Sequence, residues 1–283
     1  MSNASYTLVV QSADLDTLDL SELAELAEAG EVDRPTAGVA RLASANLANR
    51  ETVIDWCEGR ELDAAFVPSE RYFADFGLIV SDMDSTLITI ECIDEIAGRL
   101  GIKDKVAAIT ERSMAGELDF ADSLRERVAL LEGLAERELE AVYNEKVALT
   151  PGARELLAAC RQHELRFMLV SGGFTFFTER LKEDLGLDYA FANTLEVKDG
   201  KLTGRLVGDI VDAAAKARLL VEVRKELNLA PEQVIAMGDG ANDLLMLAEA
   251  GVGVAFRAKP VVRRQADVAI NHVGLDGVRH LFL

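Results

Sequence analysis

Carboxylates follow two apolar runs that lie far apart in the chain. Asp82 and Asp84 follow the run 78–80, and Asp239 follows the run 234–237. In a parallel α/β sheet the carboxyl ends of the strands share one edge, so these side chains can meet in one crevice. Oxygen ligands of this kind suit Mg²⁺. The pattern therefore predicts a magnesium site at this edge of the sheet.

Two carboxylates at the tip of one strand can divide the work of phosphoryl transfer. We predict that Asp82 attacks phosphorus as the nucleophile. Asp84 would protonate the leaving alcohol and later remove a proton from the hydrolytic water. An isolated Asp-x-Asp is more often a solvated turn, because aspartate stabilises turns through local hydrogen bonds. The interpretation therefore depends on partners elsewhere in the chain.

Two further segments carry groups that can bind a phosphoryl group. Ser171-Gly172-Gly173 follows the apolar run 167–170 and offers a hydroxyl and exposed backbone amides. Lys216 lies near the start of a helix predicted over 213–227, where it can supply a fixed cation. Each signal is weak alone, since Ser-Gly-Gly is commonly a flexible turn and lysines are mostly exposed. With the paired carboxylates they indicate a phosphoryl-transfer site.

The four segments resemble the motifs of the haloacid dehalogenase (HAD) superfamily of phosphatases, and within it the phosphoserine phosphatase family. The match runs from about Leu78 to the C-terminus, and its segments are 82–86, 171–173, Lys216 and 238–243. The resemblance implies that Mg²⁺ is held by the Asp82 carboxylate, the Asp84 carbonyl and the Asp239 carboxylate. It also implies that Asn242 and Asp243 support the site, with Asn242 in addition a substrate contact.

The same resemblance continues into a segment that is helical in pattern and is expected to choose the substrate. Its matching residues are Glu91, Met114, Phe120 and Arg127. Arg127 can bind a carboxylate through two hydrogen bonds, and Glu91 can pair with an ammonium group. Phe120 lies two helical turns from Arg127 on the same face, and with Met114 would form an apolar lid. These residues together describe a pocket for the head of an amino acid.

The expected reaction is Mg²⁺-dependent hydrolysis of O-phosphoserine to serine and phosphate through an aspartyl-phosphate. The resemblance implies that this is the last step of serine biosynthesis. Two alternatives remain open. The chain could be a phosphotransferase that passes the phosphoryl group to another hydroxy amino acid, which added acceptor alcohols would reveal. It could also sense an amino acid on the same scaffold, which predicts serine binding without turnover.

Composition restricts the classes of partner and the cellular compartment that we expect for this protein. Among 283 residues, 49 acidic and 30 basic side chains give a net charge of −19, which disfavours nucleic acid and anionic membranes as partners. Screening beyond ~8 Å leaves a local phosphate site possible. Three scattered cysteines suggest reduced thiols, no basic residue precedes Arg34, and no apolar run approaches ~18 residues. We expect a cytoplasmic protein with a small-molecule substrate and a possible homodimeric state.

The alternation of apolar runs with helical patterns after residue 150 predicts the α/β class. We expect a doubly wound, Rossmann-like parallel sheet of HAD type over 76–283, with a helical cap inserted at about 91–150. Residues 1–75 are predicted to form a small α+β domain of unknown role, with a helix capped by Ser21 and a second helical stretch over 37–47. Strands are predicted at 6–10, 64–67, 78–80, 166–170, 234–237, 251–256 and 266–270, with a hairpin over 195–206.

Overall fold

The computed structural model describes residues 5–114 and 117–283, without the side chain of Met114. The N-terminal part contains β1 (Tyr6–Gln11), α1 (Ser21–Leu26), β2 (Val32–Thr36), β3 (Val39–Ala45), α2 (Arg50–Glu58) and β4 (Asp63–Pro68). The strands form one antiparallel sheet in the order β2-β3-β1-β4. None of the helices in the described ranges is long and apolar enough to cross a membrane.

A second, seven-stranded sheet forms the centre of the molecule, in the order β11-β10-β9-β5-β6-β7-β8. Its strands are β5 (Leu78–Ser81), β6 (Arg166–Phe174), β7 (Tyr189–Lys198), β8 (Lys201–Val207), β9 (Val234–Gly238), β10 (Val252–Phe256) and β11 (Val268–Ile270). All neighbours are parallel except β7 and β8, which form the predicted hairpin at one edge. The helices beside it are α7 (Ala153–Gln162), α8 (Thr175–Leu185), α9 (Ala213–Glu226), α10 (Leu244–Ala248), α11 (Pro260–Arg263) and α12 (Gly277–His280).

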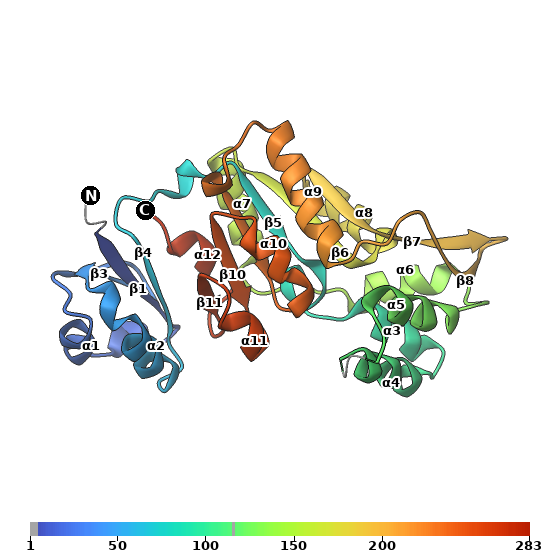
Figure 1. The fold of residues 1–283 in the computed structure, drawn as a ribbon, viewed down its shortest axis with the longest axis horizontal. Helices are drawn as coiled ribbons and strands as arrows, with labels where there is room; N and C mark the ends of the chain where they lie inside the picture. The colour runs from blue at the N-terminus through green and yellow to red at the C-terminus, as the bar shows by residue number, and fades with distance from the viewer. Residues whose placement is uncertain (1–4, 115–116) are drawn as a thin grey trace.

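Four helices between β5 and α7 lie together at the hairpin end of this sheet. They are α3 (Cys92–Arg99), α4 (Lys103–Met114), α5 (Phe120–Ala129) and α6 (Arg137–Lys146). Figure 1 shows this group, the cap, at the end of the long axis opposite the N-terminal sheet. The expected α/β class, a mostly parallel sheet with helices on both faces and a separate N-terminal α+β domain, is confirmed. The exact boundaries at 75/76 and about 91–150 stay predictions.

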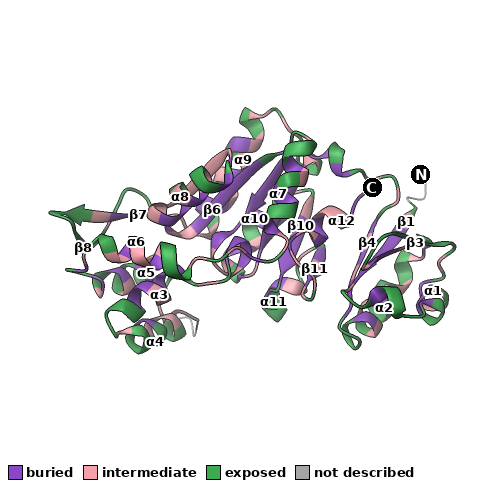
Figure 2. Cartoon of the chain, turned by 180° about the vertical axis from the view of Figure 1, so that it is seen from behind, coloured by how far each residue is buried: buried purple, intermediate pink, exposed green. Residues whose placement is uncertain are grey.

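The central strands bury alternate side chains on the two faces of the sheet, as a doubly covered sheet requires. In β5, Ile79 joins the apolar layer that includes α7 and α8, whereas Val80 joins the layer that includes α9 and α10. Figure 2 shows the resulting buried strands between partly exposed helices. Because β5 pairs with both β6 and β9 in parallel, the loops after all three strands open at one edge.

Strand β1 of the N-terminal sheet is also buried on both faces. Leu8 and Val10 of β1 pack into the cluster beneath α1 and α2, whereas Val9 packs into the large cluster of the central domain, which includes Phe282. This explains why β1 reads as a continuous apolar run rather than an alternating one. The N-terminal domain is therefore built onto the central domain by an apolar face.

Two predictions for the N-terminal domain are wrong. The stretch 37–47 contains β3 instead of a helix, because pairing with β1 and β2 outweighs the helix propensity of its alanines. Ser21 is the first residue of α1 and does not cap it. Its hydroxyl and backbone N–H both donate to Asp19, at 2.6 and 3.0 Å. A turn stabilised by Asp19 thus leads into this helix.

Polar contacts fix the N-terminal domain to the C-terminal segment. The buried carboxylate of Asp63 accepts hydrogen bonds from three consecutive backbone N–H groups, those of residues 271–273, at 2.6–2.9 Å. Gln11 donates to the carbonyl of Gly277 at 3.1 Å, and Arg41 donates to the carbonyls of His280 and Phe282. Because these contacts are largely buried, they add geometric specificity to the apolar interface.

We expect Asp63→Ala to lower the free energy of unfolding by roughly 1–3 kcal/mol, because three partly buried backbone donors lose a charged acceptor. Equilibrium urea denaturation measures this change. Asp14→Ala removes an exposed carboxylate from the same domain and should change stability by less than about 0.5 kcal/mol. Equal effects of the two substitutions would show that the Asp63 contacts do not stabilise the docked domain.

Candidate active site

The first catalytic candidates lie in a tight turn at the end of β5. Asp82 directly follows the strand, and Ser85 adopts a left-handed conformation with φ of 58° within the turn 83–87. The Ser85 hydroxyl donates to Glu91 at 2.6 Å, which helps to hold this uncommon backbone. Asp84 Oδ1 accepts a hydrogen bond from the backbone N–H of Cys92 at 2.9 Å. The turn therefore orients Asp84 toward the first helix of the cap.

Lys216 connects two carboxylates at the floor of the site. Its Nζ lies 2.6 Å from Asp82 Oδ1 and 2.7 Å from Asp243 Oδ1, and all three side chains are buried. Lys216 stands in the first turn of α9, whose start is capped by Asp212 accepting from the N–H of Ala215. One fixed ammonium thus neutralises part of the negative charge that the folded chain gathers there.

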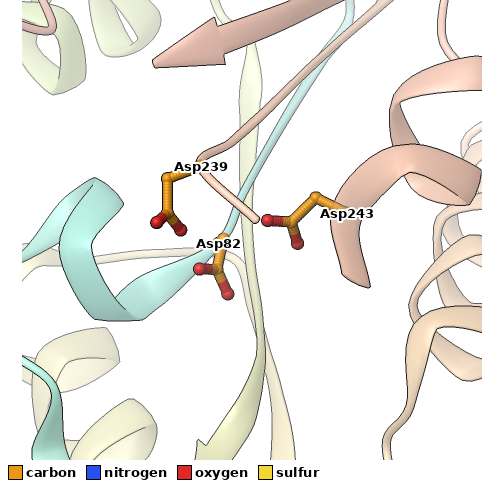
Figure 3. A group of neighbouring side chains, drawn as sticks. All are labelled: Asp82, Asp239 and Asp243. Atoms are coloured by element: carbon orange, nitrogen blue, oxygen red, sulfur yellow. The ribbon is translucent and has the colours of Figure 1, made fainter. Parts of the chain in front are cut away.

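Three carboxylates form a cluster beside this ammonium. Oxygen atoms of Asp82, Asp239 and Asp243 lie within 4.8 Å of one another. Figure 3 shows the three side chains converging, with Asp82 and Asp239 on loops and Asp243 at the start of a helix. Both oxygens of Asp243 are engaged, Oδ1 by Lys216 and Oδ2 by the N–H of Gly240 at 3.1 Å, whereas Lys216 engages only Oδ1 of Asp82. Asp82 and Asp239 are therefore better placed to bind a hard cation, for which an oxygen-only, partly buried donor set is suited.

Burial of so many acids in one place changes their pKa values. Desolvation, followed by repulsion from Glu91, raises the pKa of Asp84 to about 7. Desolvation, followed by repulsion from Asp243 and Glu91, raises the pKa of Asp239 to about 6. For Lys216, burial opposes the charge, but Asp243 and Asp82 outweigh it and raise the pKa. Without a bound cation, Asp84 can therefore carry a proton near neutral pH while Lys216 stays charged.

The segment 171–173, predicted as a turn, instead forms the carboxyl end of β6, because the strand continues to Phe174. This end of β6 faces the carboxylates and has no room for side chains at its two glycines. A β-carbon on Gly173 would stand 2.8 Å from Asp84 Oδ2, and one on Gly172 would stand 2.9 Å from the ring of Phe120. The Ser171 hydroxyl accepts a hydrogen bond from the N–H of Gly173 at 2.8 Å. Because Gly172 and Gly173 have no side chains, this end of β6 can lie against both Asp84 and the cap.

A residue that the sequence pattern did not predict, Asn193, holds this end of β6 in place. Asn193 in β7 is 1% exposed, donates to the carbonyl of Gly172 at 2.8 Å and accepts from the N–H of Val211 at 2.8 Å. Val211 lies just before α9, so Asn193 links the carboxyl end of β6 to the helix that carries Lys216. A buried asparagine inside the apolar run 190–195 was the available signal.

The cap closes over these groups to form a cavity of about 510 Å³. Glu91, Phe120 and Arg127 line it from the cap side. From the sheet side it is lined by Asp82, Asp84, Ser171, Gly172, Gly173, Asp239 and Asn242. Lys216 and Asp243 lie buried directly behind Asp82. The structure therefore brings these predicted site residues together, and the side chain of Met114 lies outside the described residues.

Further residues of the cavity wall were not anticipated. Thr110, Ser113 and Ser123 line it from the cap, and Lys259 and Val261 line it from the opposite rim. The backbone N–H of Lys259 donates to the carbonyl of Asp239 at 3.1 Å, which ties this rim to the acidic cluster. Nothing in the pattern of apolar and polar residues separates these positions from ordinary helix surface.

Comparison with known proteins agrees with this geometry. A model of haloacid dehalogenase-like hydrolases matches residues 79–248, and a model of a domain of unknown function matches residues 8–53. The chain belongs to the family of haloacid dehalogenase-like hydrolases. A phosphoserine phosphatase of Polaromonas sp. is 54% identical over an alignment that covers 74% of this chain and 90% of the relative. The resemblance found in the motifs is thus confirmed.

Solved structures of related proteins match different lengths of this chain. A probable phosphoserine phosphatase from Vibrio cholerae matches with a TM-score of 0.81 and 38% identity, covering 99% of this chain and 86% of its own. A phospho-aspartyl intermediate analogue of a phosphoserine phosphatase matches with a TM-score of 0.68 and 41% identity, covering 72% of this chain and 97% of its own. The first therefore includes a counterpart of the N-terminal domain.

We predict a pH-dependent effect of Asp84→Asn on the metal-free protein. The pKa of Asp84 rises from 3.8 to about 7 in the folded state, so ionisation opposes folding progressively as the pH increases through this range. Asparagine removes the charge. The melting temperature of the variant minus that of the wild type should therefore increase between about pH 5 and pH 8, as followed by calorimetry with chelator present. A difference that is independent of pH would contradict the raised pKa.

Proposed function

We propose that this protein is a phosphoserine phosphatase that hydrolyses O-phosphoserine through an aspartyl-phosphate at Asp82. The observation that carries the proposal is one cavity lined by two complementary sets of groups. Asp82 and Asp84 line it beside the buried Lys216, Arg127 lines it from the cap, and Glu91 lies near enough to both Asp84 and Arg127 to affect their pKa values. The carboxylate pair and the lysine suit a phosphoryl group, whereas Arg127 and Glu91 suit the charged head of an amino acid. The relatives of this chain that are phosphoserine phosphatases support the same substrate.

The first chemical step transfers the phosphoryl group to the enzyme. A carboxylate oxygen of Asp82 forms a bond to phosphorus, and the bond from phosphorus to the serine oxygen breaks. Asp84 donates its proton to that oxygen, a role that its raised pKa favours. Lys216 and the backbone amides of residues 172 and 173 stabilise the negative charge on the phosphoryl oxygens.

The second step returns the enzyme to its starting state. Asp84, now a carboxylate, takes a proton from water as the water oxygen attacks phosphorus. The bond between phosphorus and Asp82 breaks, and inorganic phosphate leaves. General acid–base help is worth only about 10²–10⁴ in rate, so covalent catalysis and charge stabilisation must supply most of the acceleration.

We infer that Mg²⁺ is the cofactor. The carboxylates of Asp82 and Asp239 and the backbone carbonyl of Asp84 would hold it, while Asn242 and Asp243 support the site. Once bound, the ion would neutralise charge on the phosphoryl group. Two observations support this fit. The donor atoms are all oxygens, and the pKa of Asp239 is raised to about 6 by burial and by repulsion from neighbouring carboxylates, which a bound cation would counteract.

The cap residues explain the choice of substrate. Arg127 and Phe120 lie on the same face of α5, and both line the cavity. Its guanidinium can bind the substrate carboxylate in a bidentate manner. Glu91, at the start of α3, can pair with the ammonium group. Phe120 lies directly against Gly172 and would help to exclude water from the phosphoryl group.

We expect Asp82→Asn to lower kcat for O-phosphoserine at least 10³-fold with Mg²⁺ present, because the nucleophile is lost. A phosphate-release assay measures the rate, and Asp14→Asn should match the wild type. Wild-type turnover by Asp82→Asn would refute the nucleophile assignment. If the wild type released no phosphate from O-phosphoserine, the substrate assignment would fail. New phosphoesters formed with added alcohols would instead identify a phosphotransferase.

A second prediction addresses the substrate head. Arg127→Ala should lower kcat/KM for O-phosphoserine about 10²-fold and change kcat/KM for an aryl phosphate less than about threefold, because only the first substrate has a carboxylate. Arg125→Ala is the matched control, since Arg125 lies on the same helix with its side chain 61% exposed. Equal losses on both substrates would argue that Arg127 acts by stabilising the cap.

A further inference from the structure

Ser123 is a buried polar residue of the cavity wall to which neither the motifs nor the proposed mechanism assigns a role. It lies on α5, is 1% exposed and borders the same cavity as Arg127. Its backbone is fully used, since its N–H donates to Asp119 and its carbonyl accepts from Arg127 Nε at 3.2 Å. Its hydroxyl has no hydrogen-bond partner among the described residues.

An unpaired buried hydroxyl is costly, typically about 1–3 kcal/mol. Serine in a helix usually avoids the cost by donating to the carbonyl one turn earlier, which the Ser123 hydroxyl does not do. Thr86 and Thr178 are the other described residues with such a hydroxyl, and neither lines the cavity. Among these three unpaired hydroxyls, that of Ser123 is therefore distinguished by belonging to a residue of the cavity wall.

The neighbours of Ser123 indicate which part of a ligand it would contact. Arg127 lies four residues further along α5, on the same face, and is joined to Ser123 by the hydrogen bond from its Nε. An ammonium group is disfavoured beside a guanidinium, whereas a carboxylate is attracted to it and offers about four lone-pair sites. The phosphoryl end of the cavity belongs to the opposite wall, at Asp82 and Ser171.

We propose that the Ser123 hydroxyl donates a hydrogen bond to the substrate carboxylate beside Arg127 and so helps to select amino-acid phosphates. This inference rests on the proposed function and adds a residue to its substrate site. The hydroxyl is held ready by the rigid helix, so little conformational entropy is lost when the contact forms.

The test compares two phosphate esters that differ in the carboxylate. Ser123→Ala in the full chain with Mg²⁺ should raise KM for O-phosphoserine roughly tenfold, with kcat changed less than about threefold, because a hydrogen bond to a charged group is lost. Phosphoethanolamine retains the phosphate and the ammonium but has no carboxylate. Its KM, or its inhibition constant if turnover is slow, should change less than twofold.

Thr178→Val provides the matched control, because it removes another buried unpaired hydroxyl away from the cavity. Its kinetics should equal those of the wild type on both esters. The melting temperature of Ser123→Ala should equal or exceed that of the wild type, which shows that the variant folds. An unchanged KM for O-phosphoserine, or equal changes on both esters, would overturn the proposal.

The outcomes separate this inference from the function on which it rests. If the wild type hydrolyses other phosphate esters but not O-phosphoserine, both the proposed function and the role of Ser123 fail. If the wild type hydrolyses O-phosphoserine and Ser123→Ala does so with the same KM, only the role of Ser123 fails.

Discussion

The ammonium of Lys216 makes the crowding of acids at the strand ends possible. Burying Asp82 and Asp243 together would be prohibitive without a fixed positive charge, and Lys216 lies within 2.7 Å of both. The folded chain still carries more buried negative charge than one lysine offsets, since Asp84 and Asp239 keep raised pKa values. The site would therefore gain stability from additional positive charge, which the proposed divalent cation would supply.

The candidate catalytic groups are linked by contacts across five segments. Gly173 lies against Asp84, Gly172 lies against Phe120 of the cap, and Asn193 of β7 joins Gly172 to the loop before α9. The carboxyl end of β6 is therefore the point where the turn after β5, the cap and the loop that leads to Lys216 are brought together. The cap and the central sheet are in direct contact at Gly172.

The sequence was informative where residue type and strand ends coincide. Asp82, Asp239 and Ser171 follow apolar runs, so topology alone brings them to one edge of the sheet. Asn193 and Ser123 were missed, because the value of a buried polar group depends on tertiary partners that no local pattern reveals. The segment 37–47 was misassigned for a related reason, since its alanines favour a helix until β1 and β2 supply strand partners.

The junction between the two domains has an evolutionary consequence. Asp63 contacts backbone N–H groups of residues 271–273, which every amino acid except proline provides. The receiving loop is therefore free to vary in side-chain identity, whereas position 63 requires a short acceptor of fixed length. Divergence across this junction should be strongly one-sided, with the acidic residue retained while the loop that it grips drifts.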